Sequence, residues 1–196
     1  MKILPQSFEI LQFDDLRVIE LAARNCYKSE DKIEDGSAAR IVLNLVKNKH
    51  LAMIEFGSAA VRVITDRAVT HEWVRHRLFS YAQESQRYCN YSKDKFNKEI
   101  TYIEQENADN QNEDYLNALR TAEKTYFALL DAGWLPQIAR SVLPNATKTE
   151  IICKANFREW LHFFELRTSP AAHPQIRKIA KEIQNEFRKR LPEIFS

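Results

Sequence analysis

The sequence predicts an α+β fold: a single compact domain over residues 1–196, with a central mixed or antiparallel sheet flanked by helices. Two periodicities indicate this, because apolar residues recur at helical spacing in some segments and alternate with polar residues in others. The length of 196 residues is typical of one domain, and neither an internal repeat nor a linker divides the chain. We therefore expect helices and strands to share one core.

The first half of the chain shows both patterns in turn. Asp14 and Asp15 can cap a first helix, and Ser37 begins a second. Residues 58–66 alternate apolar and polar side chains and are predicted to form a strand, whereas 67–74 is predicted to be helical. The buried stripes of the first two helices are expected to comprise Leu16, Ile19, Ala23 and Cys26 or Tyr27, and Ile41, Val42, Leu45 and Val46.

The second half continues the mixture with longer helices. Residues 104–114 are acidic and rich in amides, so we expect an exposed and mobile excursion there. The remaining predicted elements are a strand at 99–103, a long helix that ends before Gly133, a strand at 149–154, a helix at 156–167 and a last helix that begins at Pro174.

Composition narrows the possible functions. A net charge of +2 is small for a dedicated nucleic-acid binder, so an anionic partner should be a small molecule. No apolar run reaches the roughly 18 residues that span a bilayer, and the N-terminal residues do not resemble a signal peptide. The three cysteines are scattered and match no metal-binding spacing, which favours a cytoplasmic protein without a metal. Because the chain has three glycines and no glycine-rich loop, side chains must bind any phosphate.

The stretch from Glu72 to Tyr88 concentrates arginines, serines and amides. Arginine suits phosphate because its planar fork donates two parallel hydrogen bonds and keeps its charge. A solvated basic face is the alternative interpretation. The interleaved aromatic residues Trp73, Phe79 and Tyr81 favour a binding site, since exposed basic faces seldom carry so many rings.

Two blocks of sequence resemble one enzyme family. Arg75-His76-Arg77, followed by seven residues, Ser85 and then Arg87-Tyr88, resembles the signature of the flavin-dependent thymidylate synthases. The block from Ala139 to Arg167 is similar as well, and with His50 and Ile54-Glu55 the likeness spans roughly residues 50–180. Several separated motifs in the right order are a strong signal, whereas Arg-His-Arg alone is weak.

The resemblance implies reductive methylation of dUMP to dTMP, with 5,10-methylenetetrahydrofolate as carbon donor, FAD as mediator and NADPH as reductant. It also implies a homotetramer whose active sites combine several subunits and use no cysteine nucleophile. Carried over residue by residue, it implies FAD contacts from Arg75, His76, Arg77, Gln83, Asn156, Arg158 and His162. It implies nucleotide contacts from Glu72, Arg75, Gln83, Glu84, Ser85, Gln86, Arg87, Arg140 and Arg167. The sequence departs from the family pattern at Ala52, Phe56 and Ala82, which concerns flavin contact rather than the reaction class.

Arg167 is the implied catalytic residue. A guanidinium at the N3/O2 edge of uracil stabilises the negative charge that develops as C5 becomes nucleophilic. The alternative is a surface arginine that ends a helix and interacts with its dipole. His76, flanked by two arginines, is expected to stay neutral and therefore to contact the flavin rather than act as an acid.

Arg158 and His162 lie four residues apart on one side of the helix that Asn156 can cap. Without the resemblance, a cap followed by two solvated side chains is the better interpretation. Cys89 is the candidate thiol nucleophile because it follows Arg87 by two positions, although the resemblance implies that no thiol is needed. Cys26 and Cys153 lie on apolar stripes and are predicted to be core residues.

Two other functions remain open. One is a non-catalytic nucleotide- or RNA-binding protein that uses the arginines and aromatic rings of residues 75–87. The other is a flavin-dependent methylase or hydroxymethylase that acts on a different pyrimidine nucleotide. A protein that binds FAD would exclude the first of these functions.

Overall fold

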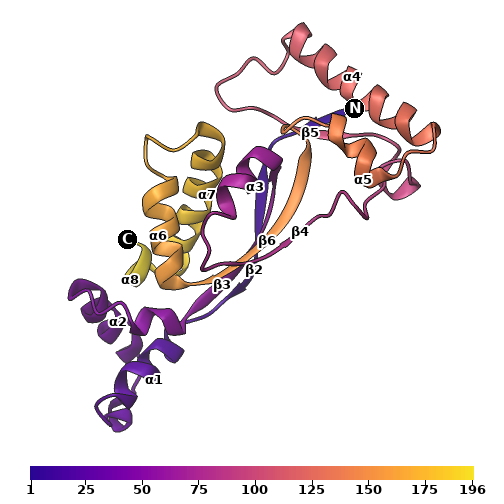
Figure 1. Ribbon diagram of the computed structural model, residues 1–196. Helices are drawn as coiled ribbons and strands as arrows, with labels where there is room; N and C mark the ends of the chain where they lie inside the picture. Colours follow the sequence, from indigo (N-terminus) through magenta and orange to yellow (C-terminus); the bar gives the residue numbers. More distant parts are fainter. The chain divides into compact units, whose positions relative to one another are not determined.

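Two sets of paired strands form the framework of the protein in a computed structural model, which describes residues 1–196 except for the side chain of Lys95 (Figure 1). One sheet has the order β2-β3-β6-β4, and β1 pairs in parallel with β5, Lys2 lying opposite Thr101. The strands are β1 (Lys2–Leu4), β2 (Ser7–Phe13), β3 (Ser58–Asp66), β4 (Ser80–Gln83), β5 (Thr101–Ile103) and β6 (Lys148–Asn156).

Helices connect and follow these strands, which confirms the α+β class. They are α1 (Arg17–Asn25), α2 (Ser37–Lys47), α3 (Arg67–Trp73), α4 (Glu113–Asp131), α5 (Pro136–Ala139), α6 (Phe157–Arg167), α7 (Pro174–Arg190) and α8 (Pro192–Phe195). Short 3-10 turns occur at Glu30–Lys32, Met53–Phe56, Asp94–Phe96 and Arg140–Val142.

The chain divides into two compact units. Unit 1 comprises Met1–Ser7, Val63–Arg75 and Ala82–Ile151, and unit 2 comprises Phe8–Arg62, His76–Tyr81 and Ile152–Ser196. All four strands of the larger sheet, β2, β3, β4 and β6, contribute residues to both units. The expectation of one domain over residues 1–196 stays a prediction.

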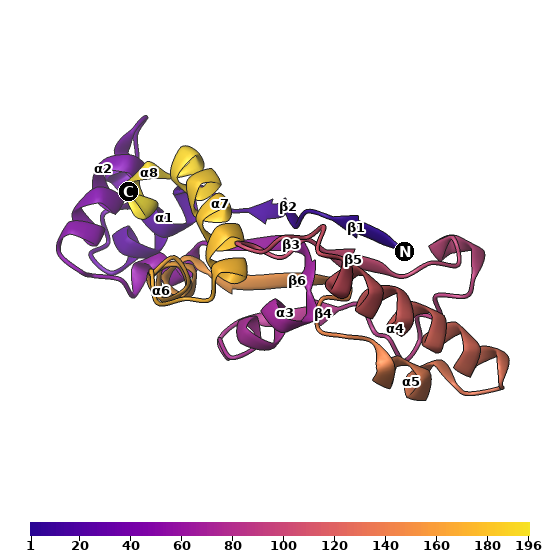
Figure 2. The ribbon, with the colours of Figure 1, turned by 90° about the horizontal axis from the view of Figure 1, so that it is seen from above.

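Unit 2 has an aromatic core beneath α6. In this unit α6 packs against α7, and α7 packs against α8 (Figure 2). The ring centroids of Trp160 and Phe187 lie 5.0 Å apart, and those of Phe187 and Phe195 are also 5.0 Å apart. Such aromatic pairs contribute roughly 0.5–1.5 kcal/mol each beyond the burial of their area. This packing holds α6 firmly, and α6 carries much of the predicted site.

Each of the two long strands ends at a side chain that caps the next helix. Asp66 at the end of β3 accepts a hydrogen bond of 2.8 Å from the backbone N–H of Val69 in α3. Asn156 at the end of β6 accepts one of 2.9 Å from the backbone N–H of Glu159 in α6. A cap of this kind stabilises a helix by about 1 kcal/mol. The predicted capping role of Asn156 is confirmed.

Gly57 permits a close approach of backbone to the start of α6. Its carbonyl accepts a hydrogen bond of 2.8 Å from the N–H of Phe157. A Cβ atom at position 57 would lie 2.5 Å from the Phe157 ring, far inside van der Waals contact. Only glycine therefore fits at this point.

The cap predicted for the first helix is wrong, because the N-cap residue of α1 is Leu16 and no side chain makes the capping hydrogen bond. Asp15 accepts a hydrogen bond of 2.9 Å from the backbone N–H of Arg17, the first residue of α1. Asp14 instead accepts hydrogen bonds from the backbone N–H and the hydroxyl of Ser58, at 2.9 and 2.8 Å. The carboxylate of Asp14 thus joins β3 rather than the helix.

The buried stripe of α1 is also shorter than predicted. Cys26 and Tyr27 are exposed, because α1 ends at Asn25 and its apolar face does not continue. The prediction that Cys153 is a core residue is confirmed, whereas the same prediction for Cys26 is wrong. Elements that the sequence patterns did not predict are β1, β2, β4, α5 and α8. Most of these have three or four residues, too few to establish a period.

Candidate functional site

The residues expected to bind FAD and nucleotide divide between the two units. Unit 2 contains His76, Arg77, Asn156, Arg158, His162 and Arg167. Unit 1 contains Glu72, Arg75, Gln83, Glu84, Ser85, Gln86, Arg87 and Arg140. Arg167, expected at the uracil ring, and most of the residues expected at the flavin therefore belong to unit 2, whereas those expected at the phosphate belong to unit 1.

Arg167 and His76 are in direct contact in unit 2. Arg167 is the last residue of α6 and is half-buried, and its Nε donates a hydrogen bond of 2.9 Å to Nε2 of His76. An imidazole nitrogen can accept only when it carries no proton, so His76 must be the neutral tautomer protonated at Nδ1. That Nδ1 lies 3.7 Å from a carboxylate oxygen of Glu159. The guanidinium of Arg167 is thus oriented by a buried, neutral ring.

The surroundings of His76 explain its neutrality. Its exposed fraction is 5%, and its ring centroid lies 5.0 Å from that of Phe163. Burial first, and then the electrostatic influence of Arg167 and His162, lowers the pKa of His76 from 6.5 to about 4. The predicted neutrality is confirmed in direction, but its cause is burial first and then two residues of α6, not the flanking arginines.

A cavity of about 580 Å³ adjoins this part of unit 2. It is lined by Glu55, Leu78, Asn156, Arg158, Glu159 and His162. Arg158 donates a hydrogen bond of 2.6 Å to Glu55, and burial raises the pKa of Glu159. The cavity therefore brings together three residues expected at the flavin, with a guanidinium and an imidazole that suit an anionic ligand.

In unit 1, two arginines from distant parts of the chain meet at Gln137 of α5. Arg87 Nε donates a hydrogen bond of 3.1 Å to the side-chain carbonyl of Gln137. Arg140 Nε donates one of 3.2 Å to its backbone carbonyl. Both guanidinium groups are exposed. Two exposed cations held at one residue form a suitable site for a phosphate.

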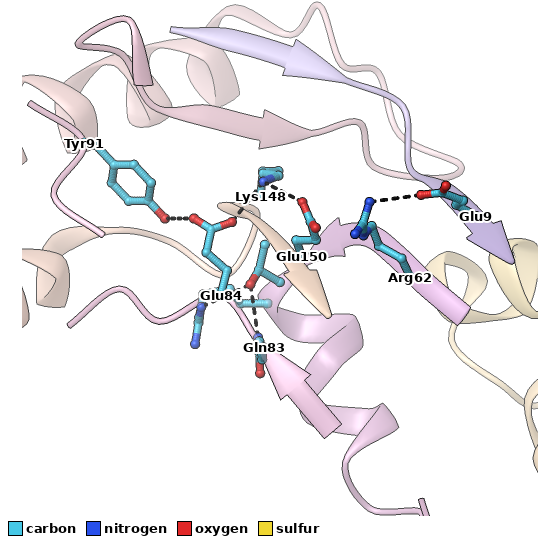
Figure 3. Close-up of polar contacts among 9 residues, drawn as sticks. Glu9, Arg62, Gln83, Glu84, Tyr91, Lys148 and Glu150 are labelled. Atoms are coloured by element: carbon cyan, nitrogen blue, oxygen red, sulfur yellow. Dashed lines mark hydrogen bonds and ion pairs between the residues drawn. The ribbon is translucent and has the colours of Figure 1, made fainter. Parts of the chain in front are cut away.

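Gln83 is fixed in the same unit by two hydroxyl groups. Its Nε2 donates hydrogen bonds of 3.0 Å to Thr70 and 3.2 Å to Thr149. The next residue, Glu84, has a carboxylate that accepts hydrogen bonds from Tyr91 and Lys148, both at 2.9 Å (Figure 3). These two predicted site residues thus already have protein partners.

The other predicted residues differ in exposure. Arg75 and Arg77 are exposed, Glu72 and Ser85 are half-buried, and Gln86 is buried with an exposed fraction of 5%.

Among the side chains that the structure describes, no group of three or more His, Cys, Asp or Glu residues is arranged to hold a metal ion.

Sequence reasoning did not identify Glu159, Gln137, Tyr91 or Lys148 as part of these arrangements. Glu159 lies within the Asn156–Arg167 block, but its spacing gives no sign that the carboxylate is buried beside His76. Tyr91 and Lys148 contact Glu84, and Gln137 contacts Arg87, at sequence separations of 7 to 64 residues. Contacts at such separations leave no periodic signal in the sequence.

Comparison with protein families gives one match that spans most of the chain. The family described as thymidylate synthase complementing protein matches residues 10–193. A flavin-dependent thymidylate synthase from Mycolicibacterium vanbaalenii is 34% identical, over 91% of this chain and 78% of its own length. Enzymes with the same description from Mycobacterium tuberculosis H37Rv and Corynebacterium efficiens are 31% and 33% identical over 91% of this chain, and cover 78% and 77% of their own lengths.

Solved structures show the same fold. A UMP/dUMP methylase, PolB from Streptomyces cacaoi bound with 5-Br dUMP, has a TM-score of 0.81 and 22% sequence identity, covering 100% of this chain and 95% of that chain. The same protein bound with 5-Br UMP has a TM-score of 0.77 and 21% identity, with coverage of 99% and 94%.

Proposed function

The chain belongs to the flavin-dependent thymidylate synthase family, and from this we propose that it is a methyltransferase that converts dUMP to dTMP with FAD as its cofactor. The resemblance stated from the motifs is thereby confirmed. The observation that carries the proposal is the hydrogen bond between Arg167 and the neutral His76, beside a cavity lined by residues expected at the flavin.

The geometry of Arg167 suits activation of uracil. Its Nε–H is held by His76, so the plane of the guanidinium is set before a nucleotide binds. A preorganised cation at the N3/O2 edge stabilises the charge that develops as C5 becomes a nucleophile. A protonated His76 would lose its acceptor nitrogen and repel Arg167, so its lowered pKa keeps the arginine in place at neutral pH.

The cavity in unit 2 has the chemistry to hold part of FAD. Arg158 and His162 provide cationic or donor groups for its anionic part, and the 78% exposed Leu78 offers an apolar surface to a flat ring. When bound, FAD supplies hydride-transfer chemistry. Arg158, His162 and Asn156 would bind and orient it.

We assign the phosphate of dUMP to the arginines that meet at Gln137. Arg87 and Arg140 are both exposed and both held by hydrogen bonds, which reduces the entropy lost when they bind an anion. Ser85 lies two residues before Arg87 and supplies a hydroxyl group. The guanidinium groups of Arg87 and Arg140 take the place of the glycine-rich phosphate-binding loop that the sequence lacks.

The co-substrates, the location and the assembly are also part of the proposal. Methylene-tetrahydrofolate serves as carbon donor and NADPH as reductant, and the enzyme is a cytoplasmic homotetramer with sites shared between subunits. The family membership supports each of them. Among the described residues, no helix is long and apolar enough to span a bilayer.

The test is a reconstituted reaction. Purified protein is incubated with FAD, dUMP, methylene-tetrahydrofolate and NADPH, and dTMP is measured by chromatography, with release of tritium from [5-³H]dUMP as a second readout. We expect a yellow protein whose flavin is released on denaturation, and formation of dTMP. A protein that stays colourless with added FAD and forms no dTMP would overturn the proposal in favour of a nucleotide-binding protein. Methylation of UMP but not of dUMP would reassign the substrate.

A further inference from the structure

Residues 85–90 form a short loop whose two flanking residues are hydrogen-bonded to each other. The hydroxyl of Tyr91 donates to the carboxylate of Glu84 at 2.9 Å. The other oxygen of that carboxylate accepts from Nζ of Lys148 in β6, also at 2.9 Å (Figure 3). One carboxylate thus ties the start of the loop to its end and to a strand.

The groups in this arrangement are well shielded from water. The side chain of Glu84 is 13% exposed and that of Lys148 is 24% exposed, and Tyr91 as a whole is 7% exposed. The backbone N–H of Glu84 donates a hydrogen bond of 2.8 Å to the carbonyl of Glu150, a second link to β6. The Tyr91 ring lies 5.9 Å from that of Tyr126. Partial burial strengthens charge-assisted hydrogen bonds, so these contacts resist opening.

The loop between the flanking residues is tight but presents its functional groups outward. The carbonyl of Ser85 accepts hydrogen bonds from the N–H groups of Tyr88 and Cys89, at 3.1 and 2.9 Å. The hydroxyl of Ser85 accepts one of 3.3 Å from the N–H of Arg87. The side chains of Arg87 and Tyr88 are exposed. The direction of Arg87 therefore depends on how the two ends of the loop are held, together with its hydrogen bond to Gln137.

A direct contact of Glu84 with a phosphate is unfavourable on electrostatic grounds. Both oxygens of the carboxylate are already engaged, and a carboxylate repels a phosphate dianion. Lys148 pairs with that carboxylate at 2.9 Å and also lies 3.9 Å from a carboxylate oxygen of Glu150, so this group of side chains has no positive charge to spare for a phosphate. The resemblance implies a nucleotide contact from Glu84, but with both of its oxygens engaged by Tyr91 and Lys148 its contacts favour structural support of the neighbouring phosphate-binding residues instead.

We propose that Glu84, Tyr91 and Lys148 form a clamp that positions Ser85 and Arg87 for the phosphate of dUMP, without touching the nucleotide. This inference rests on the proposed function, because it concerns the same phosphate site. The three members of the clamp are positioning residues. Loosening the clamp lowers affinity for the phosphate group and leaves recognition of the base unchanged.

The test compares a nucleotide with its nucleoside. Tyr91→Phe removes only the hydroxyl that closes the clamp, and Glu84→Gln removes the nearer of the two carboxylate charges beside Lys148. Titration of each variant with dUMP and with deoxyuridine separates loss of phosphate affinity from general damage. We expect about tenfold weaker binding of dUMP, equivalent to about 1.4 kcal/mol, and unchanged binding of deoxyuridine and of FAD. In turnover, KM for dUMP should rise while kcat stays within twofold.

Tyr102→Phe is the matched control. Tyr102 is a fully buried tyrosine of the same unit, and its hydroxyl donates a hydrogen bond of 3.0 Å to the carbonyl of Leu119. Loss of this hydrogen bond should lower the thermal stability of the protein and leave the ratio of dUMP affinity to deoxyuridine affinity unchanged. The same shift of that ratio in Tyr102→Phe as in Tyr91→Phe would overturn the clamp.

Arg87→Ala separates failure of the clamp from failure of the phosphate site itself. If Arg87→Ala weakens dUMP selectively but Tyr91→Phe and Glu84→Gln weaken neither ligand, or weaken both equally, the clamp is refuted and the phosphate site stands. If Arg87→Ala shows no selectivity for dUMP over deoxyuridine, the assigned phosphate site fails and the clamp fails with it.

Discussion

Removal of the titrating group at His76 should change how the stability of the protein depends on pH. The pKa of His76 is about 4 in the folded protein and 6.5 in the ordinary reference state of the unfolded chain. Above pH 6.5 the residue is neutral in both states and contributes no pH dependence. As the pH falls from 6.5 to about 4, the unfolded chain takes up a proton that the folded protein does not, so the free energy of unfolding decreases.

The size of the effect follows from the two pKa values. The difference between 6.5 and about 4 corresponds to about 3 kcal/mol when the pH has fallen below both values. Between pH 7 and pH 5 about 2 kcal/mol of this loss is expected. The raised pKa of the neighbouring Glu159 acts in the opposite direction, because its stabilising effect is present at low pH and lost as the pH rises.

The assay is urea unfolding of the wild type and of His76→Gln at pH 7 and pH 5. Glutamine retains an oxygen that can accept the hydrogen bond from Arg167 but does not titrate. Between pH 7 and pH 5 the free energy of unfolding of the wild type should fall by about 2 kcal/mol more than that of the variant. The titration of Glu159 affects both proteins and therefore cancels in this comparison. An equal loss in both proteins, within about 0.5 kcal/mol, would refute the argument that His76 is held neutral by its surroundings.

Substitutions at three residues test the assigned roles. Arg87→Ala should weaken dUMP binding by about 1.5–3 kcal/mol in a titration and leave FAD binding unchanged, and equal losses for both ligands would contradict the phosphate assignment. Arg167→Ala should keep its flavin and fold, as judged by absorbance and circular dichroism, while dTMP formation nearly stops, and Arg167→Lys should restore only part of it because a point charge lacks the fork. Near-normal turnover of Arg167→Ala would end the uracil role. Cys89→Ala should retain methylation within about tenfold, about 1.4 kcal/mol of barrier, and a variant that binds FAD and dUMP but forms no dTMP would point to a thiol mechanism.

The long elements of the fold could be predicted because each carries its own periodic or capping signal. β3 was predicted with the bounds that the structure shows, and α6 with its cap at Asn156. Short elements such as β4 and α5 have four residues each and show no period. β4 forms because it pairs with β6, and α5 packs against α4, and a local window of sequence contains neither partner.

The candidate site divides in the same way. The sequence by itself determined the family and the chemical groups of the site, because Arg75-His76-Arg77, Ser85 and Arg167 are motif residues whose side-chain chemistry is independent of the path of the chain. Only the tertiary structure decided how these groups act. Arg167 meets His76 across 91 positions, and burial of that contact sets the pKa of the imidazole. Charge and hydrogen-bonding capacity belong to a residue, whereas desolvation and contact belong to the fold, and the function of this site depends on both.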